Sequence, residues 1–152
     1  MKKILIAIDY NLSAEKVAAA GYELAKVMNA EITLVHVIAD AAYYAEQYSP
    51  IMGYNGFYTE GTIAVCTGIK KEAKDFLAAA VKHLGDPDIK TKALAGKIDE
   101  AILKYSRSHQ VDLIVIGSHR HKGLVRLLVT DVTAHILKHS EIPLFIIPTV
   151  DI

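Results

Sequence analysis

The sequence has few of the features that mark secreted, membrane-embedded or nucleic-acid-binding proteins. It contains one cysteine in 152 residues, so no disulfide framework can form within the chain. Its 17 Lys and Arg residues balance 17 Asp and Glu residues, which excludes a global basic field that would attract nucleic acid or an anionic membrane. The apolar run Ile4–Ile8 stops at Asp9, too short for a signal peptide or a membrane span. These absences predict a cytoplasmic protein with no nucleic acid or membrane partner, in which any anion site is local.

The composition is that of a chain able to build one core. Hydrophobic residues make up 52% of the sequence and charged residues 22%, with a mean hydropathy of +0.26. A chain of this length buries roughly 68–70% of the surface that its unfolded form exposes, so it folds without disulfides or a structural metal. We therefore expect a single domain over residues 1–152.

Short apolar runs alternate with segments of helical spacing along most of the chain. The predicted strands are Ile4–Ile8, Ile32–Val37, Ile89–Leu94, Leu113–Ile116 and Leu144–Pro148. The predicted helices run from Ser13 to Asn29, from Ile69 to Leu84, from Ile98 to Tyr105 and from Asp131 to His139. This order predicts an α/β fold, with a parallel sheet covered by helices on both faces and a ligand site at the carboxyl ends of the strands.

One long segment, at about residues 40–67, lacks sustained periodicity and is rich in tyrosine and glycine. Five of the eight tyrosines lie in it, namely Tyr43, Tyr44, Tyr48, Tyr54 and Tyr58. Connections of this length are often lids or interaction surfaces, and tyrosine suits partner interfaces. Two interpretations stay open: a partly ordered surface beside the cleft or dimer that recruits a protein partner, and a mobile excursion.

Two loops compete for the ligand site, Asp9–Ser13 after the first strand and Gly117–Gly123 after the fourth. Neither holds a dinucleotide-binding or P-loop pattern. The second loop is basic, and Arg120 offers a planar fork that suits a phosphate or carboxylate. A small anionic ligand and a merely solvated basic loop both remain open.

Four segments together resemble the universal stress protein family: Lys3–Asp9, Leu34–Ile38, Asp112–His119 and Ile142–Pro148. The resemblance covers nearly the whole chain. It implies a Rossmann-like, adenine nucleotide alpha hydrolase-like fold, with a five-stranded parallel sheet in the order 3-2-1-4-5. It also implies a homodimer formed through the edge strand, here Leu144–Ile147.

Members of this family that bind ATP carry a characteristic loop: glycine, two residues, glycine, nine residues, glycine, then serine or threonine. Here Gly117 matches the first glycine, but Arg120, Thr130 and Asp131 stand at the other three positions. Arg120 and Thr130 add side chains where the backbone should approach phosphates. A carboxylate near a phosphate costs about 4 kcal/mol at 4 Å and an effective dielectric near 20, so Asp131 opposes ATP.

Two other positions favour a nucleotide. By the resemblance, Asp9 matches the acidic residue near ribose and phosphates, and the backbone of Val37 matches the group that reads adenine. The cofactor is therefore either none or ATP or AMP with Mg²⁺. The candidate binding residues are Asp9, Val37, Gly117, Ser118, His119, Arg120, Thr130 and Asp131.

The remaining reactive side chains do not form an enzyme site. His135 and His139 have metal-ligand spacing but no third ligand alongside, so we expect an exposed helix surface and no metal. Cys66 has no nucleophile signature and His36 is expected in the core. We therefore predict a stress-response binding protein with at most weak incidental nucleotide hydrolysis. An adenine-nucleotide regulator and a partner-recruiting module remain the alternatives.

Overall fold

The protein is described here by a computed structural model that covers residues 1–38, 60–120 and 132–150. Its strands are β1 (Lys3–Ala7), β2 (Glu31–Ile38), β3 (Lys90–Ala95), β4 (Leu113–Arg120) and β5 (Leu144–Val150). Its helices are α1 (Ala14–Val27), α3 (Glu60–Leu84), α4 (Ile98–Ser108) and α5 (Val132–His139). The predicted alternation of strands and helices is thus confirmed.

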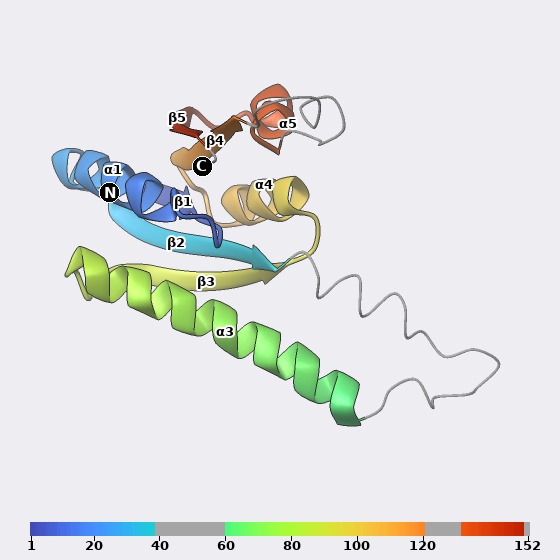
Figure 1. Ribbon diagram of the computed structural model, residues 1–152. Helices are drawn as coiled ribbons and strands as arrows, with labels where there is room; N and C mark the ends of the chain where they lie inside the picture. Colours follow the sequence, from blue (N-terminus) through green and yellow to red (C-terminus); the bar gives the residue numbers. More distant parts are fainter. Residues whose placement is uncertain (39–59, 121–131, 151–152) are drawn as a thin grey trace.

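The five strands form one parallel sheet in the order β3-β2-β1-β4-β5 (Figure 1). This confirms the fold class and the strand order that the resemblance implies. The order reverses at β1, which lies between β2 and β4, and such a switch point is where open α/β sheets bind ligands.

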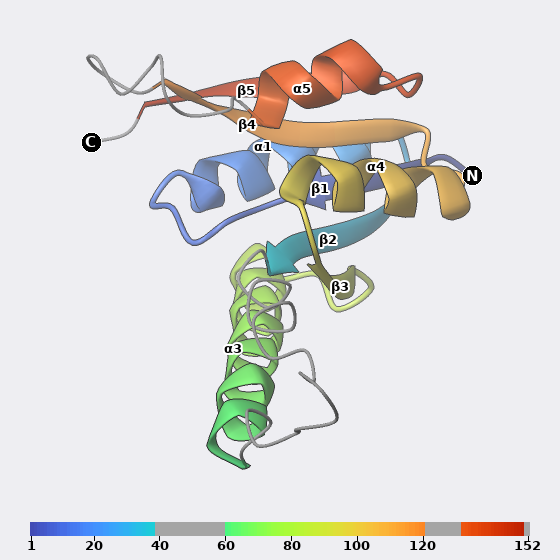
Figure 2. The same cartoon turned by 90° about the vertical axis from the view of Figure 1, so that its right-hand side faces the viewer.

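Helices cover both faces of the sheet (Figure 2). On one face α1 and α3 enclose a core that includes Ile4, Ile6, Leu34 and Val115. On the other face α4 and α5 pack over Leu5, Val35, Ile114 and Ile116. Because successive strand residues point to opposite faces, the continuous apolar runs of β1, β2 and β4 supply both cores at once.

Among the boundaries that differ from the sequence-based expectation, two bear on the candidate site. Helix α3 begins at Glu60, whereas the apolar spacing predicts a start at Ile69. Figure 1 shows that its first turns extend past the ends of β2 and β3, where a helix needs no regular apolar face. The tyrosine-rich segment over residues 39–59, and with it the partner-recruiting surface, lies outside the described residues.

The second difference concerns β4, which continues through Gly117 to Arg120 instead of ending at Ile116. The cause is β5, whose ladder with β4 runs on to the pair Arg120↔Val150. The first half of the predicted basic loop is therefore strand. Its second half, residues 121–123, lies outside the described residues, and so do Thr130 and Asp131.

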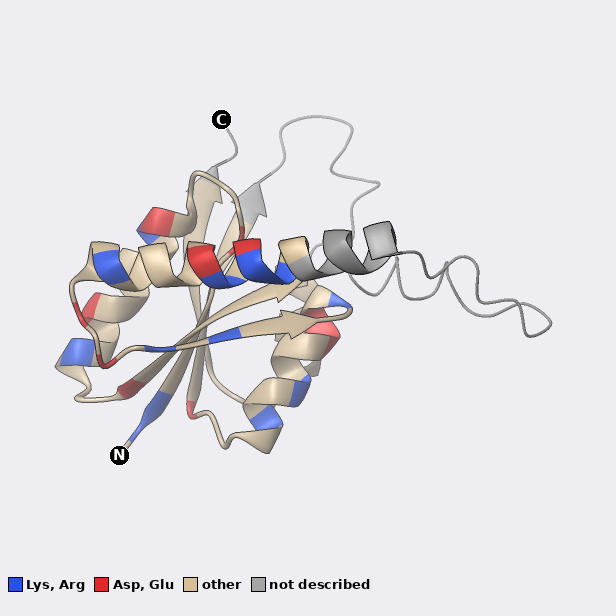
Figure 3. Cartoon of the chain, turned by 90° about the horizontal axis from the view of Figure 1, so that it is seen from below, with Lys and Arg blue, Asp and Glu red and all other residues tan. Residues whose placement is uncertain are grey.

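Charged side chains of both signs are interspersed on the face seen in Figure 3, most clearly along α3. This agrees with the formal net charge of +0. Within the described parts of the chain, no helix is long and apolar enough to cross a bilayer.

Candidate functional site

The candidate site lies where β1 ends before its two neighbours. Pairing of β1 with β2 reaches Ala7↔Val35, and pairing with β4 reaches Ile6↔Val115. Continued by the same register, Asp9 lies level with Val37 on β2 and with Ser118 on β4. We call this place the β1 notch: the carboxyl edge of the sheet where Val37–Ile38 and Ser118–Arg120 extend beyond β1.

The backbone of Val37 presents polar groups to the β1 notch. The Ile8 amide donates to the Val35 carbonyl at 2.9 Å, so the peptide groups of Val35 face β1. Since backbone direction alternates along a strand, the N–H and C=O of Val37 face the same side, beyond the last β1 pair. The valine side chain itself is buried on the α4 and α5 face.

Local hydrogen bonds fix the loop that carries Asp9. The Asn11 amide donates to Asp9 Oδ1 at 3.2 Å, and the Ser13 amide donates to Asn11 Oδ1 at 3.1 Å. Asp and Asn favour such turns because their short side chains reach the backbone two residues on. The exposed Asp9 carboxylate is thereby held at the floor of the β1 notch, where it can accept hydrogen bonds from hydroxyl groups or share a cation.

Two threonines hold the β4 side of the notch. Thr133 on α5 donates from Oγ1 to the Gly117 carbonyl at 2.9 Å, and Thr149 on β5 donates from Oγ1 to the Ser118 carbonyl at 2.5 Å. Sequence reasoning missed both, because a threonine in an apolar helix or strand gives no local signal of its partner. They fix the backbone at the β4 end of the site.

Gly117 has a packing role here. A Cβ at this position would lie 2.9 Å from Val17 Cγ2 and 3.3 Å from Thr149 Cγ2. Only glycine lets α1 approach β4 this closely. A glycine matching a phosphate-loop motif is thus also required by the fold.

The structure brings together only part of the predicted binding set. The strand register, continued past the last β1 pairs, sets Asp9 level with Val37 and Ser118 at the β1 notch, with Gly117 one residue before Ser118. The backbone of His119 and Arg120 continues β4, paired with Thr149 and Val150, while their side chains lie outside the described residues. Ladder alternation turns the His119 peptide groups toward β1, so the His119 N–H also faces the notch.

Aromatic side chains line the β2 side of the site. The Tyr10 ring lies 4.4 Å from the His36 ring and 4.9 Å from the Phe76 ring of α3. The Ile8 carbonyl is an acceptor, so the 2.9 Å contact from His36 Nδ1 means that this nitrogen donates. His36 is 5% exposed, which confirms the prediction of a satisfied core histidine. Desolvation and then the negative charge of Glu72 raise the pKa of Tyr10 above its usual value, so its hydroxyl is neutral at physiological pH.

The histidines of α5 have other contacts. His135 Nδ1 lies 2.5 Å from Asp99 Oδ2 on α4, a contact that the sequence did not reveal. His139 Nδ1 donates to the His135 carbonyl at 2.9 Å. Within the described ranges, no three His, Cys, Asp or Glu side chains gather as a metal site. The Cys66 side chain lies outside them.

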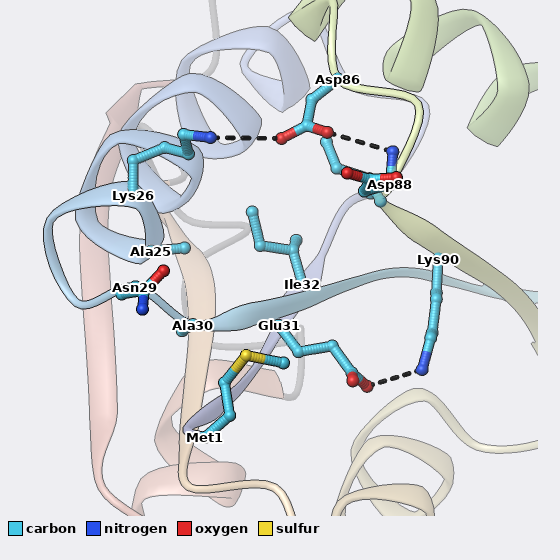
Figure 4. Close-up of a pocket in the computed structure, with 11 residues that line it drawn as sticks. Met1, Ala25, Lys26, Asn29, Ala30, Glu31, Ile32, Asp86, Asp88 and Lys90 are labelled. Carbon is cyan, nitrogen blue, oxygen red and sulfur yellow. Dashed lines mark hydrogen bonds and ion pairs between the residues drawn. The ribbon is translucent and has the colours of Figure 1, made fainter.

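A hollow of about 310 Å³ lies at the opposite, amino edge of the sheet (Figure 4). Lys90 Nζ is 2.8 Å from Glu31 Oε1, and Lys26 Nζ is 3.7 Å from Asp86 Oδ2. The hydrogen bond and charge of Lys90 lower the pKa of Glu31. Because each lysine pairs with a carboxylate, neither positive charge is left to bind an anionic ligand. The β1 notch is therefore the better candidate site.

Proteins that resemble this chain include nucleotide complexes. A solved structure of a universal stress protein is in complex with cAMP (TM-score 0.62, 19% identity, covering 96% of this chain and 95% of that one). Another, from Archaeoglobus fulgidus, is in complex with dAMP (TM-score 0.61, 17% identity, 97% and 98%).

Sequence and structure comparisons agree on the family. Universal stress protein UspA from Lactobacillus plantarum superposes with a TM-score of 0.73 at 20% identity, covering 96% of this chain and 97% of that one. Universal stress protein MJ0577 of Methanocaldococcus jannaschii is 28% identical over 153 residues, covering 96% of this chain and 94% of the relative. The sequence model of the universal stress protein family matches residues 1–148. The chain therefore belongs to the universal stress protein family.

Proposed function

We propose that this protein is a regulatory binding protein, not an enzyme, and that its ligand is an adenosine monophosphate held at the β1 notch. The observation that carries the proposal is that β1 stops at Ala7 while β2 and β4 run on past it; the register of the last pairs, continued by two residues, sets Asp9 level with Val37 and Ser118. It supplies a backbone edge, a carboxylate and the end of β4 side by side.

The backbone edge of Val37 suits adenine. It offers one N–H donor and one C=O acceptor toward the notch, while adenine offers its N1 acceptor and its N6 amino donor side by side. A buried polar site of this kind discriminates because a wrong partner leaves donors or acceptors unpaired. Asp9, level with Val37, is placed to accept from ribose hydroxyls.

The residues of the phosphate loop favour one phosphate over three. Arg120 can form two parallel hydrogen bonds to a single phosphate. Asp131 stands where ATP-binding relatives have serine or threonine, and its repulsion grows with every added phosphate charge. The two related complexes contain cAMP and dAMP, both monophosphates. AMP is therefore the preferred ligand, and ATP with Mg²⁺ is the weaker one.

Binding measured by isothermal titration calorimetry tests this function. We expect AMP to bind, and Asp9→Asn to weaken it about tenfold, because a hydrogen bond to a charged group contributes about 1.5–3 kcal/mol. Asp88→Asn is the matched control, since Asp88 is an exposed carboxylate at the opposite edge of the sheet. Loss of binding in both variants, or in neither, contradicts the assignment.

We further propose that two copies pair through the outer edge of β5 in the cytoplasm, where a chain with one cysteine suits the reducing conditions. The Ile114 amide donates to the Pro143 carbonyl at 3.0 Å, so the peptide groups of odd-numbered β5 residues face β4. The peptide groups of Ile146 therefore face outward, away from β4. Pro148 also falls on this outward side, where its missing N–H removes no bond to β4. An open edge of this kind accepts a second strand.

The edge pairing is testable with one substitution. Ile146→Pro removes an outward N–H while leaving the β4 ladder intact, and Phe145→Leu is the control on the same strand. Native mass spectrometry should show a dimer for the wild type and the control and a monomer for Ile146→Pro. A dimer in all three would contradict pairing through β5.

A further inference from the structure

Tyr10 occupies an unusual position for an aromatic residue that follows a buried strand. It lies directly after Asp9, yet the residue is 56% exposed. Its ring rests against His36 at 4.4 Å with an interplanar angle of 46° and against Phe76 at 4.9 Å with an angle of 59°. One side of the ring is thus supported and much of the rest faces solvent.

The support beneath Tyr10 is rigid. His36 is 5% exposed and tied by Nδ1 to the Ile8 carbonyl. Phe76 meets the His36 ring edge-on, at 5.6 Å and 78°. These rings come from β2 and α3, two elements that pack through the core, so the position of Tyr10 does not depend on its own loop alone.

The location of this cluster matters because His36 immediately precedes Val37. The ring of Tyr10 therefore lies beside the stretch of β2 whose backbone faces the β1 notch. A flat base hydrogen-bonded to the Val37 edge needs a flat apolar surface against one face, and tyrosine supplies such a surface at low conformational cost. The neutral phenol adds no negative charge beside a phosphate.

We propose that Tyr10 is the base-stacking residue of this protein and confines the site to ligands with an aromatic base. The inference rests on the proposed function, since it assumes that the notch binds a nucleotide. It goes further by assigning a role to a residue that the family loop pattern does not include. Tyr10 contacts the base, His36 and Phe76 position Tyr10, and Val37 reads the base edge.

Two variants separate the ring from the hydroxyl. Tyr10→Leu removes the aromatic face and keeps an apolar side chain, whereas Tyr10→Phe keeps the face and removes the hydroxyl. Stacking of a base on an aromatic side chain is lost on truncation with about a tenfold or greater fall in affinity. The control is Tyr105→Leu, because Tyr105 stacks on His109, which follows α4, at 3.8 Å on the other face of the sheet.

The experiment measures AMP affinity by calorimetry and the absorbance of bound AMP at 260 nm, with the thermal midpoint of each ligand-free variant as the test of folding. We expect Tyr10→Leu to weaken AMP binding about tenfold and to abolish the loss of AMP absorbance that stacking causes. Tyr10→Phe and Tyr105→Leu should stay within about twofold of the wild type.

Three outcomes would overturn the inference. The first is a Tyr10→Leu variant that keeps wild-type affinity and absorbance. The second is a Tyr10→Phe variant that loses as much affinity as Tyr10→Leu, which would assign the effect to the hydroxyl. A wild type that does not bind AMP overturns the proposed function and this inference together. Wild-type binding that survives Tyr10→Leu overturns this inference alone.

Discussion

Adding one methyl group at Gly117 tests why β4 carries a glycine beside the site. The new Cβ would lie 2.9 Å from Cγ2 of Val17 and 3.3 Å from Cγ2 of Thr149. Both neighbours are short β-branched side chains, which cannot swing aside as the end of a long side chain can. The backbone of α1 or β4 must shift instead.

The size of the effect follows from two opposing contributions. Overpacking a core costs about 1–3 kcal/mol. Replacing glycine by alanine at a compatible backbone conformation returns about 0.4–1 kcal/mol by restricting the unfolded chain. Gly117→Ala should therefore lower the free energy of unfolding by about 1–2 kcal/mol, and the melting temperature by about 2–8 °C for a chain of this size.

A double-mutant cycle identifies the contact that is responsible. Val17→Ala removes Cγ2, the atom nearest to the new methyl, so Gly117→Ala should cost much less in that background. Urea unfolding of the wild type, both single variants and the double variant should give a favourable coupling of about 1–2 kcal/mol. Additivity within about 0.5 kcal/mol would refute the packing explanation.

Three further predictions concern a second glycine, an acid-sensitive contact and the phosphate loop. Gly21→Ala should also lower the free energy of unfolding in the same urea assay, because its Cβ would lie 2.8 Å from Ile6 Cδ1 and 3.1 Å from Val115 Cγ1, both fully buried, and this overpacking outweighs the roughly 1 kcal/mol of helix propensity that alanine returns; an unchanged stability contradicts this. The Lys3 amide, followed by the charge of Lys2, lowers the pKa of Asp112 from 3.8, so the unfolded chain binds more protons. Stability from Asp112 is thus present above about pH 3.8 and lost as pH falls through the lower folded pKa. Asp112→Asn should make the urea midpoint depend less on pH across this range, and a pH dependence equal to that of the wild type would contradict the assignment. Changing Arg120, Thr130 and Asp131 together to Gly, Gly and Ser should strengthen ATP binding at least tenfold in calorimetry, since about 4 kcal/mol of repulsion is removed; no gain would contradict the account of the loop.

Much of the fold could be predicted because the strands that matter are continuous apolar runs. The unbroken apolar runs Ile4–Ile8 and Leu113–Ile116 indicate burial on both faces of the sheet, and helical spacing is regular wherever a helix packs on the sheet. The strand order came from the family resemblance, because periodicity does not encode which strands are neighbours. The apolar spacing predicts a start of α3 at Ile69 and not at Glu60, because the first turns of the helix extend past the sheet and need no apolar face.

The candidate site could be predicted in part, and the limits have physical causes. Asp9 and Val37 were selected as single positions, but their common level in the sheet depends on strand register. The contact between Tyr10 and Phe76 joins residues far apart in the chain, and so does the contact of His135 with Asp99. No local sequence pattern predicts contacts between residues so far apart in the chain. The sequence predicts an end of β4 at Ile116 because Gly117 follows, whereas pairing with β5 extends the strand to Arg120.

The central claim is that adenine is read by the backbone of Val37 at the β1 notch, and the amide resonance of that residue reports on it directly. Uniformly ¹⁵N-labelled protein would be titrated with AMP and followed by two-dimensional NMR. The account predicts a large downfield shift of the Val37 amide proton as its N–H gains a hydrogen bond, with Glu31 and Lys90 at the opposite edge unmoved. A Val37 amide that stays in place while AMP binds elsewhere, or a spectrum that AMP leaves unchanged, would contradict it.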